Sequence, residues 1–187
     1  KMANSPIRPS KKVLDSMSKI FADKENKEFS LIEDQIVARN LILDRINNFN
    51  GTKKNVIVVK GGPGTGKTVI ALHILAILAG DKKQRHNIRF ATKSKPLLEG
   101  IKNQLPKDSK AKLLFSNLSQ MLPANCEKNS IDVLIIDEAH RIVNNPNNQY
   151  MPKEMRTDKN QIQTLIDASE ISIFFIDDKQ AIRSREI

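Results

Sequence analysis

A short run of residues has the types and spacing that a bound phosphate needs. The run fits the pattern G-x-x-x-x-G-K-[ST] and consists of Gly61, Gly62, Pro63, Gly64, Thr65, Gly66, Lys67 and Thr68. Glycines let the backbone wrap closely around an anion, so that its N–H groups point at the phosphates. Lys67 supplies a mobile cation for the β- and γ-phosphates, and the hydroxyl of Thr68 suits Mg²⁺. We therefore expect this P-loop to bind a nucleoside triphosphate with magnesium.

Two acids follow a second apolar run, in the string Ile-Ile-Asp-Glu-Ala-His. Acids at the C-terminal end of a buried strand lie on the ligand-binding edge of an open α/β sheet. We expect Asp137 to hold Mg²⁺ and Glu138 to act as the general base toward a water molecule. Strand-end acids can also cap the next helix, a reading that the nearby P-loop disfavours. For His140, coupling the site to a partner and simple packing are equally compatible with the sequence.

A third apolar run, residues 171–176, also ends in polar residues, among them Asp177 and Gln180. These side chains either reach the γ-phosphate or its attacking water, or they form an ordinary turn after the strand.

The elements that must position these residues are predicted from apolar patterning. Helices are expected over residues 32–47, 67–79, 97–104 and 162–168, and strands over residues 56–59, 88–91, 112–115, 133–136 and 171–176. The strand at 56–59 has no polar alternation, which predicts burial on both faces. Residues 144–160 read as a long exposed loop. Strands that alternate with helices predict an α/β fold, with a parallel sheet of about five strands flanked by helices.

Composition bounds the partners and the compartment. The formal net charge is +10, which favours polyanions such as nucleic acid, although a solvated surface is the plainer alternative. Aromatic residues make up 4% of the chain, so a base-stacking platform is poorly supplied. Cys126 is the only cysteine, which excludes an internal disulfide and a cysteine-based zinc cluster. No apolar run is long enough to span a bilayer, and we expect a cytoplasmic protein with no membrane partner.

Taken as a set, the motifs resemble the first RecA-like domain of superfamily 1 helicases. GGPGTGKT corresponds to motif I, ATKSK to motif Ia, IIDEAH to motif II, and the D-x-x-Q of residues 177–180 to motif III. The strings KGGPGTGKT, IDEAHR and FFIDDKQAIR are also similar to a bacterial family of helicase-like ATPases. That family is known as domain of unknown function 2075 and is related to the helicase portion of Schlafen proteins.

This resemblance implies a division of the chain and an ATP site. Residues 1–30 would be an N-terminal extension with a short helix, and residues 31–187 a RecA-like P-loop NTPase domain. Gln35 would read adenine, and residues 61–68 would bind the phosphates of ATP. Mg²⁺ would be held by Thr68 and Asp137.

The resemblance also implies catalytic and strand-binding residues. Lys67, Glu138 and Gln180 would be catalytic, with Glu138 as the base and Gln180 as a γ-phosphate sensor. A single strand of DNA or RNA would contact Thr92, Lys93, Ser94 and Lys95. Two departures stand out: Ile176 replaces the usual Gly before motif III, and no counterpart of motifs IV to VI follows. A second RecA-like domain in cis, which would carry an arginine finger, is therefore expected outside this sequence.

Two functions of different classes remain open. The first is an ATP-hydrolysing motor domain of a helicase or translocase, weakly active alone. The second is an ATP-gated switch that regulates a partner or a fused nuclease without moving along a strand. A small-molecule kinase is disfavoured because no Arg-rich lid segment is present, and a GTPase because no N-K-x-D motif follows the P-loop.

Overall fold

The computed structural model describes residues 31–81, 86–121, 125–144, 147, 156 and 158–177. The expected N-terminal extension (residues 1–30) and Gln180 lie outside the described residues. So does most of the expected loop at 144–160.

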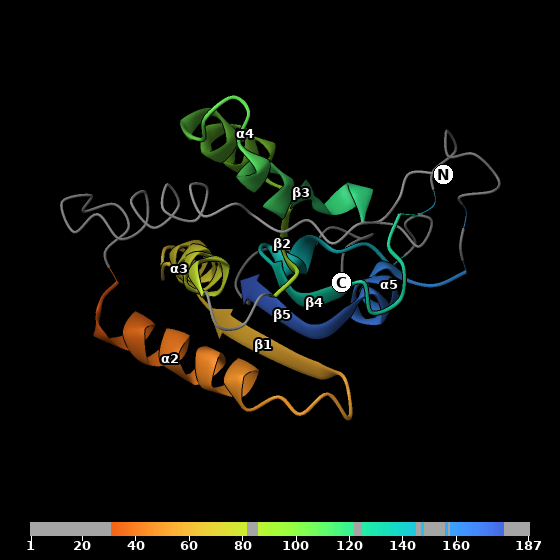
Figure 1. The fold of residues 1–187 in the computed structure, drawn as a ribbon, viewed down its shortest axis with the longest axis horizontal. Coiled ribbons are helices and arrows are strands. Elements are labelled where there is room, and N and C mark those ends of the chain that lie inside the picture. The colour runs from red at the N-terminus through yellow and green to blue at the C-terminus, as the bar shows by residue number, and fades with distance from the viewer. Residues whose placement is uncertain are drawn as a thin grey trace.

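A five-stranded, all-parallel sheet forms the centre of the molecule (Figure 1). Its strands follow the order β1-β5-β4-β2-β3. Their bounds are β1 Asn55–Gly61, β2 Ile88–Thr92, β3 Phe115–Asn117, β4 Ile131–Ile136 and β5 Ser169–Asp177. The prediction of a parallel sheet of about five strands is confirmed. Parallel neighbours need crossover connections, and helices supply most of them here.

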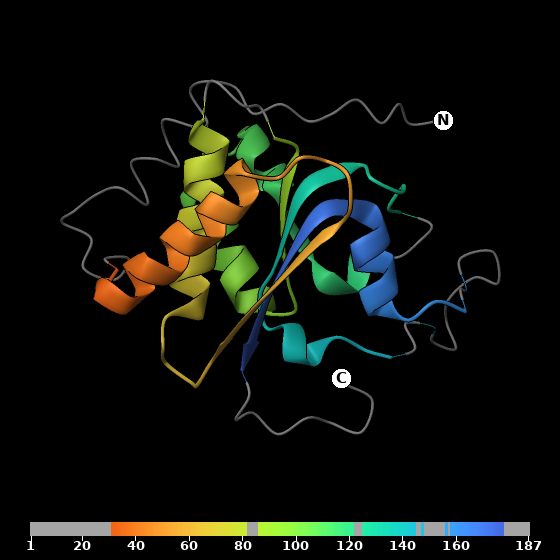
Figure 2. The same cartoon turned by 90° about the horizontal axis from the view of Figure 1, so that it is seen from below.

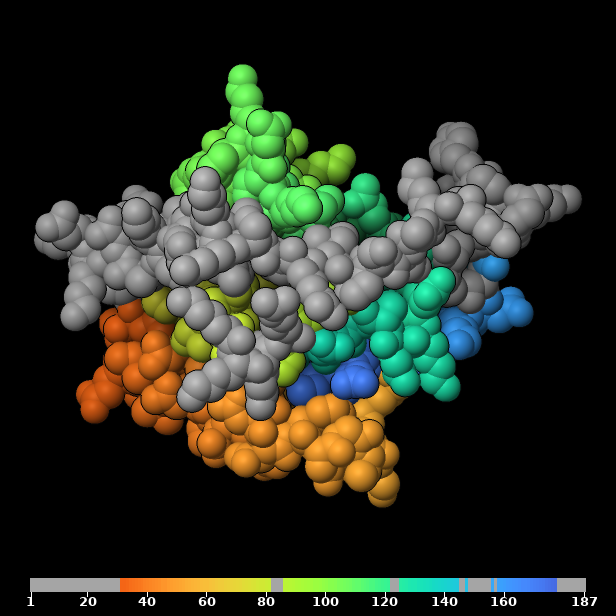
Figure 3. All heavy atoms as spheres, viewed as in Figure 1, coloured from red at the N-terminus to blue at the C-terminus, as the bar shows by residue number. Residues whose placement is uncertain are grey.

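Helices flank the sheet on both faces, which completes an α/β, RecA-like fold. The α-helices are α2 Glu33–Asn47, α3 Lys67–Gly80, α4 Lys95–Gln104 and α5 Gln161–Ala168. Short 3₁₀ turns add η2 Lys110–Leu114, η3 Leu118–Gln120 and η4 Ala139–Arg141. Figure 2 shows α2 and α3 on one side of the sheet and α5 on the other. In the space-filling view of Figure 3, α2 and β1 occupy one end of the visible face and α4 the opposite end.

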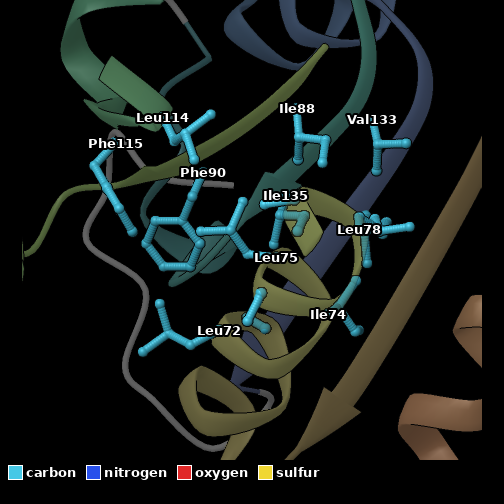
Figure 4. Close-up of a cluster of buried hydrophobic side chains, with 14 of the residues drawn as sticks. Leu72, Ile74, Leu75, Leu78, Ile88, Phe90, Leu114, Phe115, Val133 and Ile135 are labelled. Carbon is cyan, nitrogen blue, oxygen red and sulfur yellow. The ribbon is translucent and has the colours of Figure 1, made fainter. Parts of the chain in front are cut away.

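The core consists of two apolar clusters, one on each face of the sheet. Alternation along β5 feeds both of them: Ile171, Ile173 and Phe175 join the α3 side, and Phe174 joins the α5 side. Helix α3 is apolar on nearly all sides, and most of its apolar residues are buried. Figure 4 shows its leucines and Ile74 packed against side chains of β2 and β4. Helix α3 is therefore fixed firmly behind the P-loop.

Two predictions about strands were wrong. Residues 112–114 form the 3₁₀ turn η2, whose N-cap Ser109 accepts a hydrogen bond from the Ala111 N–H at 3.2 Å, and β3 begins only at Phe115. The strand β1 is not buried on both faces, because Val56 and Val58 are 44% and 50% exposed. An apolar run without alternation does not distinguish a central strand from one like β1, which lies at the edge of the sheet that the described residues form.

No helix in the part of the chain that the structure describes is long and apolar enough to cross a bilayer.

Candidate nucleotide-binding site

Three neighbouring strands end at the same edge of the sheet, next to residues that are expected to bind nucleotide. β1 leads into the P-loop, β4 ends directly before Asp137, and β5 lies between them and ends at Asp177. Gly61 and Asp177 are register partners across β1 and β5. The carboxyl ends of parallel strands thus bring together segments that are about a hundred residues apart in sequence.

The P-loop owes its path to two left-handed residues. Gly64 has φ 73° and Gly66 has φ 80°, a region that glycine enters without strain. Gly66 is the N-cap of α3, so the first turn of that helix follows the loop directly. Its free N–H groups and the helix dipole favour an anion at this position. Thr65 closes the loop on itself through a hydrogen bond from its Oγ1 to Gly62 O at 2.9 Å.

Lys67 is folded into the loop that it follows. Its Nζ donates to Gly61 O at 2.8 Å and to Gly62 O at 2.7 Å. It also forms an ion pair with Asp177 Oδ2 at 3.5 Å. The predicted phosphate-binding ammonium is therefore at the site, surrounded by two backbone carbonyls and one carboxylate.

Thr68 and Asp137, the predicted magnesium pair, are in direct contact. Thr68 Oγ1 donates to Asp137 Oδ2 at 2.8 Å, although 69 residues separate them in sequence. Asp137 is 2% exposed, and its own N–H is held by Ala91 O of β2 at 2.9 Å. Burial raises the pKa of the Asp137 carboxyl above its usual value, and the bond from Thr68 offsets only part of this shift. A hydroxyl and a buried carboxylate at this spacing are a suitable ligand pair for Mg²⁺.

Glu138 has a backbone conformation that is unusual for its type, with φ 52° and ψ 43°. Its carboxylate accepts a hydrogen bond from Arg141 Nη1 at 3.0 Å, as part of an ion pair across one turn. Sequence reasoning missed the pairing with Arg141. The spacing of three residues would have suggested it only if the turn η4 had been foreseen, since such pairs meet on helical turns.

His140 contacts the neighbouring strand. The ring is 5% exposed, and its Nδ1 accepts a hydrogen bond from the Asp177 N–H at 3.3 Å. The other ring nitrogen, Nε2, is buried and has no hydrogen-bond partner among the described residues. His140 thus joins the segment after β4 to the end of β5, so it packs in the interior and also links two parts of the site.

Gln35 lies beside the P-loop, on α2. Its Nε2 donates to Thr65 O at 2.9 Å, and its Oε1 accepts from the Ile32 N–H at 3.1 Å. A Cβ added to Gly66 would collide with this amide, so the Gln35 side chain would have to move, and the φ of 80° already favours glycine there. The amide that was expected to read adenine therefore contacts the loop in this structure, with one N–H and one lone pair still uncommitted.

The four residues expected to meet a nucleic acid strand lie at the end of β2. Thr92 is fully buried and its Oγ1 accepts from the Ser94 N–H at 3.2 Å, while Ser94 caps α4 through the Leu97 N–H at 3.4 Å. Lys95, the first residue of α4, is exposed, and Lys93 is half-buried. The two hydroxyl residues shape the turn, and the two lysines place positive charge beside the edge that carries Asp137.

Comparison with known families finds a match, which covers most of these residues. The model of the Schlafen group 3 DNA/RNA helicase domain matches residues 54–187, a segment that includes the P-loop, Asp137, Glu138 and the end of β5. The chain belongs to this family. The Schlafen group 3 match begins after α2, so Gln35 lies outside the matched segment. A search of curated proteins found no match to the chain.

Proposed function

We propose that this helicase-like domain binds ATP with Mg²⁺ and hydrolyses it. In this proposal it is the first motor domain of a superfamily 1-type helicase or translocase, of the kind found in the domain of unknown function 2075 family. The observation that supports the proposal is the 2.8 Å contact between Thr68 and Asp137, because a P-loop hydroxyl and a strand-end carboxylate in direct contact are suited to share one Mg²⁺ ion.

Each residue has a task in the proposed reaction. The P-loop amides and Lys67 would hold the β- and γ-phosphates, and Thr68 with Asp137 would hold the magnesium ion. Bound Mg²⁺ neutralises charge that develops on the phosphates. Glu138 takes the proton of the attacking water as general base. We assign the γ-phosphate sensor to Gln180 and adenine contact to Gln35, through the amide positions that its two hydrogen bonds leave open.

Two rearrangements precede catalysis in this scheme. Lys67 must turn from the Gly61 and Gly62 carbonyls toward the phosphates, and Glu138 must leave Arg141 to face water. An arginine finger from a second RecA-like domain in cis would supply the remaining charge, and such a group contributes about 10³- to 10⁵-fold in rate. Low turnover by this domain alone follows from the proposal.

Nucleic acid is the proposed partner. Lys93 follows β2, which lies next to β4 in the sheet, and Lys95 begins α4. In this proposal both lysines contact the phosphate backbone of a single strand of DNA or RNA. The net charge of +10 supports binding of a polyanion.

A specific observation favours a second candidate, an ATP-gated switch. The Glu138 carboxylate is paired with Arg141 at 3.0 Å, so one of its oxygens is engaged until the pair opens. A domain held in this state would bind ATP and change its contacts to a partner while hydrolysing slowly.

The test compares nucleotide binding and turnover in the full-length protein. Lys67→Ala is expected to abolish binding of a fluorescent ATP analogue, because the phosphates lose their mobile cation. Glu138→Gln should keep binding but lower ATP turnover by about 100-fold or more. The matched control is Lys60→Ala, which removes an exposed lysine of β1 and should behave as wild type.

Addition of a single-stranded oligonucleotide separates the two candidates. Turnover that rises with the oligonucleotide supports the motor. Slow turnover that ignores it, combined with ATP-dependent partner binding, supports the switch. Wild-type turnover in Glu138→Gln would remove Glu138 from the mechanism.

A further inference from the structure

We propose that Asp177 is a positioning residue that competes with the triphosphate for Lys67. When nucleotide is absent, it holds the Lys67 ammonium beside the Gly61 and Gly62 carbonyls. The inference rests on the proposed function, because it concerns how that same site accepts ATP.

The surroundings of Lys67 motivate the proposal. An ammonium group has three N–H donors, and here two backbone carbonyls and the Asp177 carboxylate surround it. The Lys67 side chain is only 14% exposed and that of Asp177 is 3% exposed, so water screens this pair weakly. The strongest anion near the ammonium thus belongs to the protein itself.

The backbone of Asp177 is anchored to two neighbouring segments. It is the last residue of β5, it faces Gly61 in the register, and its N–H is bonded to His140 Nδ1. The backbone that carries the carboxylate is therefore held when Lys67 turns toward a phosphate. Separating such a pair leaves a buried charge with less compensation, which opposes the movement.

Binding of ATP must overcome this opposition, because the triphosphate takes the ammonium from Asp177 and also brings negative charge toward the carboxylate. Neutralising Asp177 removes both effects, so it should favour nucleotide. The competing idea is that Asp177 helps to hold Mg²⁺, in which case the same change would weaken binding and would do so only when metal is present.

The experiment measures binding of a fluorescent ATP analogue to the full-length protein, with Mg²⁺ and again with EDTA. Asp177→Asn should bind roughly tenfold more tightly than wild type in both conditions, within the range of typical coupling energies. Asp177→Glu keeps the charge and should not show this gain. Asp167→Asn removes one negative charge near the end of α5, just before the start of β5, and should leave affinity unchanged.

The outcomes separate this inference from the proposed function. If wild type binds no nucleotide, both are overturned. Suppose instead that wild type binds nucleotide, that Lys67→Ala does not, and that Asp177→Asn binds as wild type does. Only the competition between Asp177 and the triphosphate is then overturned. Weaker binding by Asp177→Asn, whether with Mg²⁺ alone or in both conditions, also overturns it. Asp177→Ser replaces the Asn variant if thermal unfolding shows that the latter does not fold.

Discussion

Asp137 combines deep burial with a position at the proposed magnesium site. A carboxylate that loses its water shell is less stable in its charged form, and one hydrogen bond from Thr68 does not restore what hydration supplied. The folded protein therefore binds a proton at Asp137 more tightly than the unfolded chain does. Ionisation of this group works against folding.

The pH dependence of stability follows with a definite sign. Because the pKa of Asp137 is raised in the folded state, its contribution to stability is lost as pH rises from the usual carboxyl range through the folded pKa. Asp137→Asn cannot ionise and keeps an acceptor for Thr68. In acid, we expect the variant and the wild type to have nearly equal free energies of unfolding. As pH rises to neutral, the variant should become the more stable of the two. Urea unfolding across this range measures the difference, and a variant that is less stable at neutral pH would contradict it.

At the scale of single residues, motif spacing was sufficient to predict that residues 61–68 and the acids after β4 lie together; their binding of nucleotide stays a prediction. Contact between Thr68 and Asp137 confirms that these two segments meet. The partners of the charged groups were not predicted, because pairing depends on rotamers and on the turn η4. Arg141 beside Glu138 and Asp177 beside Lys67 emerged only from the structure.

At the scale of elements, Lys54 joins two segments that the sequence keeps far apart. Its Nζ donates to Ile166 O at 2.7 Å, Asp167 O at 3.0 Å and Ser169 O at 2.6 Å, where α5 passes into β5, and to Asn129 Oδ1 at 2.6 Å. Carbonyls at the C-terminal end of a helix lack intrahelical donors, and a cation satisfies them. One ammonium thus ties the start of β1 to the end of α5.

Removal of this ammonium should destabilise the fold. Lys54→Met keeps most of the aliphatic chain but loses the donors, and we expect a loss of about 2 kcal/mol in the free energy of unfolding. Lys53→Met is the matched control, since Lys53 is the exposed neighbour and should change stability by less than about 0.5 kcal/mol. Chemical denaturation of both variants measures the contrast, and equal effects would mean that the oxygens around Lys54 are satisfied equally well by water.

Elements with strong apolar patterns were predicted closely, α3 and β4 among them. β3 was misplaced because it is short and follows the 3₁₀ turn η2, and neither element is long enough to give a clear periodic signal. A strand of three residues depends on its neighbour β2 for stability, and no local pattern encodes that pairing.

For the whole molecule, the strand order decides which parts resist opening. β4 and β5 have neighbours on both sides, whereas β1 pairs only with β5 among the described residues. A strand paired on one side leaves alternate N–H groups without a ladder partner. The P-loop therefore follows the strand at the sheet's edge, and the acids follow its centre.

Hydrogen exchange should reproduce this gradient. We expect amides of residues 131–136 to exchange only on global unfolding, and the outward amides of residues 55–61 to exchange at least about 100-fold faster. Exchange measured by mass spectrometry or NMR at neutral pH tests this. Equal protection of the two strands would show that another segment pairs with the outer edge of β1.

The order of the strands was beyond sequence reasoning. Alternation of strands and helices predicted a parallel sheet, but not that β5, the last strand in the chain, lies between β1 and β4. That position is set by packing of long-range neighbours, and it puts Asp177 within reach of Lys67.

The left-handed backbone at Glu138 has an implication for evolution of this site. A residue with a Cβ in that region carries about 1–2 kcal/mol of strain, which glycine would relieve. A chain selected for stability alone would have glycine there and a larger free energy of unfolding. The most stable sequence and the sequence that has this carboxylate are therefore different.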